Sequence, residues 1–260
     1  MPEPAPWTET GGIGPLWASQ SWRLTAFLSS VAPPSEQDWW TRIIGQEPDT
    51  RSASPKQGLR QEQGAYSNGT LILSTQPGRV DWLYSSEVPG DAPTSDDRRT
   101  LGPVAESLER FRAVALPWLM DSPHIVRLAV GAVLQRPAIG RDDAYRLIME
   151  MVPGLRLDSP GCSDFVYQIN RPRPSKTVPE RAINRLSKWS ANAVQVVQFD
   201  MMLADPSIHL ISQPTFSAQL ELDLSTSAPE KSDLELADLP PLFEELVTLG
   251  LEIAVSGDIP

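Results

Sequence analysis

The stretch 162–200 constrains the fold most, because two β-prone runs in it flank a rigid, proline-rich loop. The first run ends at Asn170, where Arg-Pro-Arg-Pro follows. Each proline fixes its own φ and restricts the residue before it, so the first strand must stop there. A second run at 189–199 is rich in valine and aromatic residues and predicts a neighbouring strand. The sequence therefore predicts two strands joined by a loop at 171–188.

The loop 171–188 is basic in an acidic chain. It carries six basic residues and one glutamate, a net charge of +5, whereas the whole chain has a formal net charge of −11. Arginine can hold a carboxylate or a phosphate with two hydrogen bonds, and prolines lower the entropy that a loop loses on binding. We therefore expect ligand binding at the loop and at the tryptophan that follows it. The candidate residues are Arg171, Arg173, Lys176, Arg185, Lys188 and Trp189.

An intramolecular role for the loop is the alternative. The segment 221–258 contains ten acidic residues and one lysine, a net charge of −9. Two segments of opposite charge can neutralise each other inside one fold, and the loop would then hold no ligand. The two cases differ in exposure, because only a basic patch that faces solvent can bind an anion or a nucleic acid.

Composition limits the class of protein. With 260 residues, 40% of them hydrophobic, the chain can form one large domain or two small ones. No run reaches the roughly 20 apolar residues of a membrane helix, and the N-terminal residues do not resemble a signal peptide. The single Cys162 leaves no intramolecular disulfide to form. We expect a cytoplasmic protein without a membrane partner, and the pI near 4.7 makes nucleic-acid binding unfavourable outside the basic loop.

The first half of the chain predicts an irregular arm, a strand, a helix, three strands and a second helix. After the proline-rich arm, a strand is expected at 22–31, and Ser35 is the expected N-cap of a helix that ends at Gly45. The polar residues 46–58 are expected to form a loop. A helix that begins at Pro103 closes this half.

The clearest local pattern lies between these helices, at 59–85. Three short β-prone runs are separated by Asn68-Gly69 and by Gln76-Pro77-Gly78. The first pair predicts a type I′ hairpin turn and the second triplet a type II turn. Asn68 also begins a glycosylation sequon, but the turn is the stronger interpretation. The pattern therefore predicts a three-stranded antiparallel meander.

The second half predicts the same order. A strand at 124–135, with Gly131 as a bulge or a point of close approach, precedes a helix at 141–152. Three strands are then expected at 164–170, 189–199 and 214–224, and Asp238 is expected to cap the last helix.

The predicted fold class is α+β, with two tandem β-α-β-β-β-α units that form one or two antiparallel sheets and carry the helices on one side. The expected parts are the arm at 1–21, a first unit at 22–121 and a second unit at 122–260. A gene duplication explains this order. The alternative is that many α+β chains show such an order without one.

Several motifs resemble those of a sporadically distributed, uncharacterised prokaryotic protein family of about this length. They are GTLILSTQPGRVDW in the first half, QINRPRPS and INRLSKW in the middle, and LELDL followed by LFEELVTLGLE near the end. The resemblance spans most of the chain in layout. It implies a fold of this kind and no reaction, because the family has no assigned activity. The tandem units also resemble the saddle of TATA-binding proteins in topology, which does not confer function.

Motifs of catalysis and of metal binding are not evident. His124 and His209 lie far apart in the sequence and have no ligand spacing. No Gly-x-Ser-x-Gly elbow occurs, and the glycines at 11–14 precede no Gly-Lys-Ser/Thr. We therefore expect no catalytic residue, no metal and no cofactor.

Three functional hypotheses follow. The first is a non-enzymatic binding protein that uses the basic loop for an anionic ligand or for the acidic surface of another protein. The second is an enzyme whose carboxylates and arginines converge only in the fold. The third is nucleic-acid binding through the same loop. The sequence gives no oligomeric state.

Overall fold

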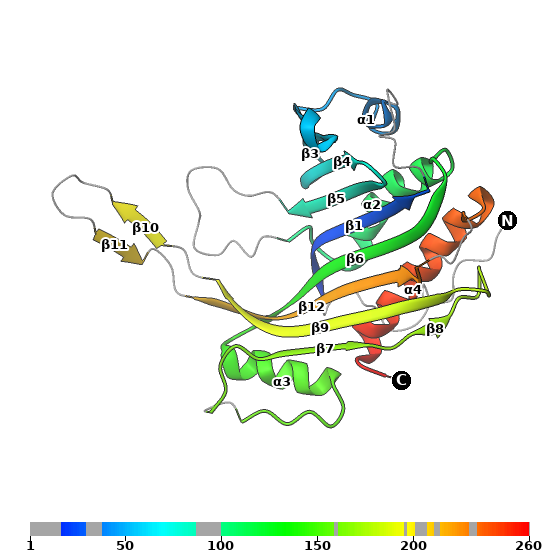
Figure 1. Cartoon of the computed structure of the whole chain (residues 1–260). Helices are drawn as coiled ribbons and strands as arrows, with labels where there is room; N and C mark the ends of the chain where they lie inside the picture. The colour runs from blue at the N-terminus through cyan, green and yellow to red at the C-terminus, as the bar shows by residue number, and fades with distance from the viewer. Residues whose placement is uncertain are drawn as a thin grey trace.

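The computed structural model describes residues 17–29, 38–86, 100–158, 161–194, 197–200, 207–210, 214–228 and 233–259. These residues form a large antiparallel sheet and four helices (Figure 1). The helices are α1 (Trp39–Ile44), α2 (Val104–Leu119), α3 (Arg141–Met151) and α4 (Leu239–Ser256). The strands are β1 (Ala18–Leu28), β2 (Thr50–Ser54), β3 (Leu59–Tyr66), β4 (Gly69–Gln76), β5 (Arg79–Ser86), β6 (Ile125–Ala138), β7 (Val166–Asn170), β8 (Arg173–Pro174), β9 (Ala182–Val194), β10 (Val197–Asp200), β11 (Ser207–Leu210) and β12 (Thr215–Thr226).

Ten of these strands form one sheet. Its order is β2-β3-β4-β5-β1-β6-β12-β9-β7, and β8 pairs with β9 beside this path. Strands β1 and β6 pair with each other in the middle of the sheet. Strands β10 and β11 form a separate antiparallel pair that projects from the sheet in Figure 1.

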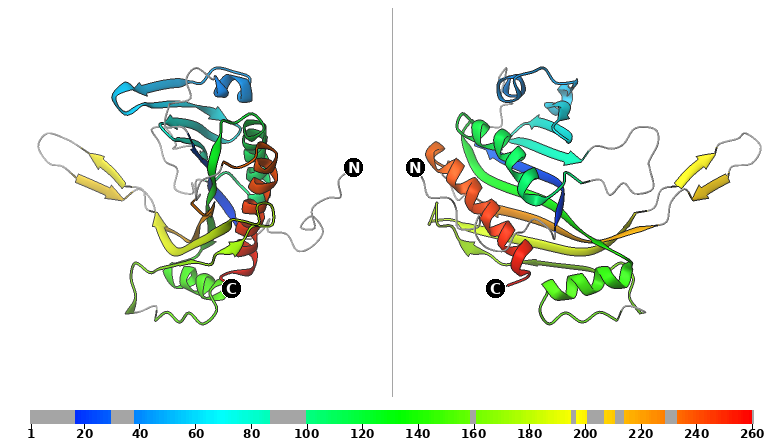
Figure 2. Two further views of the ribbon diagram at one scale, coloured as in Figure 1. Left: turned by 45° about the vertical axis from the view of Figure 1, so that its right-hand side comes forward. Right: turned by 180° about the vertical axis from the view of Figure 1, so that it is seen from behind.

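One face of the sheet is apolar and carries the helices. In β1 and β6 the apolar residues under the helices recur at every second position, as the period of a strand requires when one face is covered. They are Trp22, Leu24, Ala26, Leu128, Val130, Ala132 and Leu134, and all are buried. Helix α2 packs on β1, and α4 packs on β12 and β6. Both helices lie in front of the strands in the right-hand view of Figure 2.

Tryptophans join the short helix α1 to this layer. The rings of Trp39 and Trp118 meet edge to face at 5.6 Å, which joins α1 to α2. Trp40 stacks on Trp82 of β5 at 6.2 Å. An aromatic side chain buries more apolar area than most other side chains. These two contacts therefore stabilise α1, whose six residues would not form a helix alone.

The predicted three-stranded meander is confirmed, with one turn displaced. Tyr66 pairs with Gly69, so the first turn consists of Ser67 and Asn68, one residue earlier than predicted, and Ser67 takes the positive φ of 54°. Gly69 is needed for close packing, because a Cβ there would lie 2.4 Å from the carbonyl oxygen of Ser85. The Pro77-Gly78 turn has the predicted positive φ at Gly78.

Several predicted boundaries were wrong or lie outside the described residues. Strand β2 occupies part of the expected loop at 46–58, because backbone pairing with β3 and the Arg51–Glu62 ion pair form an edge strand that needs no apolar run. Strand β9 begins at Ala182, inside the expected loop at 171–188, because it pairs with β12 from Ile183 to Val194. It ends at Val194, and 197–199 of the strand expected at 189–199 belong to β10, which pairs with β11. The N-cap of α1 is Asp38, which accepts a hydrogen bond from the Thr41 N–H, and Ser35 is outside the described residues.

The predicted starts of the other three helices are confirmed. Helix α2 follows Pro103, α3 begins at Arg141, and α4 follows Asp238. The irregular arm expected at 1–21 is wrong for 18–21, which belong to β1 because they pair with β6. Trp17 is buried and its indole N–H donates to Ala254 O, so it packs on α4. None of the described helices is both long and apolar enough to cross a membrane.

Gly257 lets α4 end against α3, which gives a test of the fold. A Cβ at Gly257 would lie 2.0 Å from Met151 O, whereas a Cβ at Gly154 would meet nothing within 4 Å. Both glycines have positive φ. We expect Gly154→Ala to cost about 1 kcal/mol of unfolding free energy for the backbone alone. Gly257→Ala should cost about 3 kcal/mol, because overlap with a backbone carbonyl adds to that term. Urea unfolding measures both, and equal losses would contradict a tight contact between α3 and α4.

Candidate functional site

The basic loop closes onto helix α4. Arg171 donates from Nε and Nη2 to the carboxylate of Asp258, the second contact at 2.9 Å. Arg173 donates from Nη1 to both oxygens of Glu252, at 2.9 and 3.1 Å. Arg185 Nη2 lies 3.5 Å from the same carboxylate. We call these five side chains the clasp, because they join the β7–β9 edge of the sheet to the C-terminal end of α4.

A second carboxylate of α4 holds the tip of the loop. Glu245 accepts hydrogen bonds from the backbone N–H groups of Lys176 and Thr177, at 2.6 and 3.0 Å, and from the hydroxyl of Ser175 at 2.8 Å. Burial opposes the charge on Glu245, but these hydrogen bonds outweigh burial and lower its pKa. The loop is therefore fixed by backbone contacts as well as by ion pairs.

The electrostatics of the clasp follow from these contacts. The hydrogen bond from Arg171 is the main cause that lowers the pKa of Asp258, and the hydroxyl of Tyr167 adds a second donor. Burial lowers the pKa of Arg185, and the neighbouring Arg173 lowers it further. Arg185 is 1% exposed. The clasp thus contains a buried cation that lies beside two others.

The structure separates the six candidate binding residues. Arg171, Arg173 and Arg185 belong to the clasp, and the exposed Lys176 lies beyond it at the loop tip. Trp189 is fully buried and meets Trp17 edge to face at 6.2 Å. Lys188 lies on the other face of the sheet, where its Nζ is 2.9 Å from Glu221 Oε1. The residues do not form one exposed basic patch, so the arrangement of the three arginines matches neutralisation by the acidic segment.

A groove on the other face of the sheet is the second candidate region. Its volume is about 390 Å³. No helix of the described residues packs on this face, which Figure 1 shows with α2 and α4 behind the strands. The lining residues are Ser21, Arg23, Leu83, Gly131, Ala132, Val133, Gln168, Leu186, Lys188, Glu221, Leu222 and Asp223.

The strand register places the groove residues in a row. Leu83, Arg23, Gly131, Asp223 and Leu186 pair in turn across β5, β1, β6, β12 and β9. Because successive strands lie about 4.8 Å apart, the Cα atoms of Arg23 and Asp223 are roughly 10 Å apart. Gly131 between them carries no side chain, so a neighbouring side chain can lie directly over its backbone.

Arg23 is the distinctive charge of the groove. A Cβ at Gly131 would lie 3.5 Å from Arg23 Nε and 3.5 Å from Nη2, so the guanidinium extends over the glycine. Arg23 is exposed and forms no hydrogen bond or ion pair with the residues that the structure describes. Lys188, by contrast, is paired with Glu221. The groove therefore presents one available guanidinium between two leucines.

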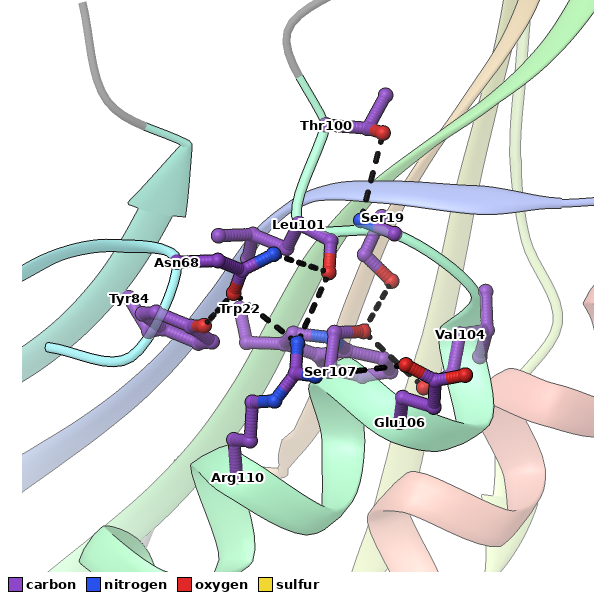
Figure 3. A network of polar contacts seen from close by, with 11 residues as sticks. Ser19, Trp22, Asn68, Tyr84, Thr100, Leu101, Val104, Glu106, Ser107 and Arg110 are labelled. Atoms are coloured by element: carbon purple, nitrogen blue, oxygen red, sulfur yellow. Dashed lines mark hydrogen bonds and ion pairs between the residues drawn. The ribbon is translucent and has the colours of Figure 1, made fainter.

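A third polar cluster is internal. Ser107 of α2 accepts a hydrogen bond from the Trp22 indole at 3.0 Å and donates to Ser19 at 2.8 Å (Figure 3). Arg110 donates to Asn68 Oδ1 and to Leu101 O. Each polar group here has a partner, so the network fixes α2 on β1 and on the β3–β4 turn.

Sequence reasoning missed the groove for a clear reason. The sequence predicts a bulge or a point of close approach at Gly131. The Arg23 guanidinium lies close above it, and the strand register shows no bulge there. Arg23 and Asp223 are 200 positions apart in the sequence and resemble ordinary solvent-facing strand residues. Their relation appears only when β1, β6 and β12 are adjacent.

Comparisons of the chain with protein families, with curated proteins and with solved structures found no match. The described residues contain no group of three or more His, Cys, Asp and Glu side chains that could hold a metal ion. The resemblance to a prokaryotic family stays a prediction.

The clasp makes stability depend on pH through Asp258. Its pKa in the folded state is lowered from 3.8, so its stabilising contribution is complete above about pH 4 and is lost as the pH falls through the lowered folded value. We expect Asp258→Asn to lower the unfolding free energy by about 1 to 3 kcal/mol at neutral pH. The difference from wild type should narrow below pH 4 in thermal melts.

Asp158→Asn is the matched control, since Asp158 is exposed. It should leave the melting temperature within about 1 °C of wild type at every pH, because exposed charges contribute little. A loss in Asp258→Asn that does not change with pH would contradict an ionic role for Asp258.

Proposed function

We propose that this protein is a non-enzymatic binding protein that recognises another protein through the open face of its sheet. The observation that carries the proposal is the exposed Arg23 guanidinium above Gly131, which has no partner among the described residues. A guanidinium binds a carboxylate with two parallel hydrogen bonds, and the pair is stronger where apolar groups exclude water. Leu83 and Leu186 supply such groups at the two ends of the row.

The expected occupant is an acidic side chain of a partner protein. Nine strands at about 4.8 Å spacing give a face roughly 40 Å wide, which is enough for the approximately 800 Å² that each partner buries in a stable interface. The charge of the groove is mixed, since Glu221 and Asp223 lie beside Arg23 and Lys188. Mixed charge suits a protein surface better than a phosphate backbone, which two carboxylates would repel.

The basic loop has an internal role in this proposal. Three of its arginines are engaged by Asp258 and Glu252. Removing an arginine from these pairs in order to bind a ligand would leave a carboxylate of α4 unpaired and partly buried, which is costly. The binding function that the sequence suggested for the loop therefore moves to the groove. The single cysteine favours a reducing compartment, and we propose the cytoplasm.

We further propose that the fold arose by duplication. The order β3-β4-β5-β1 on one side of the sheet corresponds to β7-β9-β12-β6 on the other, with β1 and β6 as the first strands of the two units. Each unit contains two helices, α1 and α2 or α3 and α4. The groove spans the junction of the units at Arg23 and Gly131, and binding sites are often found at such junctions.

Photo-crosslinking tests the binding proposal. A photoreactive phenylalanine is placed at Leu83 in the groove or at Met120, which is 60% exposed at the end of α2. We expect a crosslinked partner from position 83 and none from position 120, in extract of the source cells. Arg23→Glu in the Leu83 probe should abolish this crosslink, because the reversed charge repels the acidic group of the partner.

Arg156→Glu is the control for charge, since Arg156 is also exposed and has no partner among the described residues. It should leave the crosslink unchanged. The proposal fails if Arg23→Glu retains the crosslink, or if both probe positions capture the same proteins equally.

A further inference from the structure

The sheet has two end strands, β2 and β7, and their edges differ. The edge at β2 is charged, because Arg51 there forms an ion pair with Glu62. The edge at β7 has the sequence Val-Tyr-Gln-Ile-Asn, without a charged residue or a proline. Val166 is 54% exposed, and Gln168 and Asn170 are exposed as well. Charges protect an edge strand from pairing with another chain, so β7 lacks the protection that β2 has.

The backbone of β7 alternates between β9 and the free edge of the sheet. The register runs unbroken from β7 through β8, and just beyond β7 the N–H groups of Arg171 and Ser175 donate to carbonyls on the β9 side, at 3.3 and 2.9 Å. Because an antiparallel strand directs every second residue at its partner, the odd-numbered residues from 167 to 175 face β9. The N–H and C=O groups of Val166, Gln168 and Asn170 therefore point away from β9, and they have no backbone partner among the described residues.

The open stretch of this edge is symmetric about Gln168. Four residues later, Pro172 occupies an outward position and has no N–H to donate. Four residues earlier, Asp164 has a φ of 54°, which ends the extended backbone. Two copies of β7 can therefore pair antiparallel about a two-fold axis at Gln168. Gln168 would face the same residue of the second copy, and Val166 would face Asn170.

We propose that this protein forms a weak symmetric dimer in which β7 of one copy pairs with β7 of a second copy. Each hydrogen-bonded antiparallel pair exchanges two hydrogen bonds, and the three outward residues of β7 form three such pairs. A second copy fits this edge because its two ends lie at equal distances from the centre and no like charges face each other.

The surroundings of β7 agree with a weak contact. Helix α3 lies near this margin of the sheet in Figure 1, but it packs chiefly on β9, β12 and β6. Because β7 is short, the interface is smaller than the roughly 1,600 Å² of a standard one, and we expect a dissociation constant of roughly 10 to 100 μM. The two-fold axis is perpendicular to the sheet, so both grooves would lie on the same side of the dimer.

Sedimentation velocity of the full chain, from about 1 to 300 μM, tests the dimer. We expect the weight-average sedimentation coefficient to rise across this range. Gln168→Pro should raise the dissociation constant by at least about 10-fold, because it removes the central donor of both copies. It should leave the fold intact, since the N–H that it removes faces away from β9. Gln168→Thr keeps this donor and is the matched control, which should dimerise as the wild type does.

Engineered cysteines test the register in a Cys162→Ser background, and they keep the test valid if Gln168→Pro does not fold. Under mild oxidation Gln168→Cys should form a disulfide-linked dimer, because the Cα atoms of a hydrogen-bonded pair lie about 5.5 Å apart. A mixture of Val166→Cys and Asn170→Cys should crosslink faster than either variant alone. Ser52→Cys, at the exposed edge strand β2, is the control and should stay monomeric.

Any of three results overturns the dimer. These are a sedimentation coefficient that does not rise up to about 300 μM, a dimer that Gln168→Pro does not weaken, and a disulfide that forms as fast at Ser52→Cys as at Gln168→Cys. Failure here leaves the groove proposal intact, because Arg23 and Leu83 lie on β1 and β5, away from β7.

Discussion

A sheet of ten strands is stable in water only when one of its faces is buried, and this constraint governs the rest of the structure. The alternation of buried residues along β1, β6, β12 and β9 provides one apolar face, and the helices cover it. The remaining features follow from the burial of this face. The other face stays open, with the groove around Arg23 and Gly131 on it. The C-terminal end of α4 is held against the β7–β9 edge of the sheet, which keeps the apolar stripe of the helix buried.

The clasp joins the C-terminal end of α4 to that edge. Asp258 and Glu252 lie at the C-terminal end of the helix, where nearby cations are also favoured by the helix dipole. Their partners come from the loop that follows β7 and from β9. Proline at 172 and 174 limits the conformations of this loop, so the arginines are positioned before the ion pairs form. The same charges that suggest a binding loop in the sequence thus serve as an internal connection.

Local sequence patterns predicted much of the fold. The features that they could not predict depend on pairing between strands that are distant in the sequence. The meander at 59–85 and the helices after Pro103 and Asp238 depend on turns, caps and periodic apolar residues, which a single sequence displays. Strand β2 has no such pattern, because its stability comes from β3. Arg185 resembles a loop residue in the sequence, yet it is buried because Ile183 and Trp189 on the same face of β9 must enter the core. The groove depends on three strands that are distant in sequence, so no linear motif could show it.

The loop arginines are internal partners of Glu252 and Asp258, and we propose that binding uses the open face of the sheet instead. Melting curves of a variant with Arg171, Arg173 and Arg185 all changed to glutamate test this most directly. The measurement is made at low and at high ionic strength, with gluconate as the anion. We expect a large loss of melting temperature at low ionic strength that becomes smaller at high ionic strength, because screening weakens both the native ion pairs and the new repulsion. A melting temperature within a few degrees of wild type at both ionic strengths would contradict an internal role for these arginines.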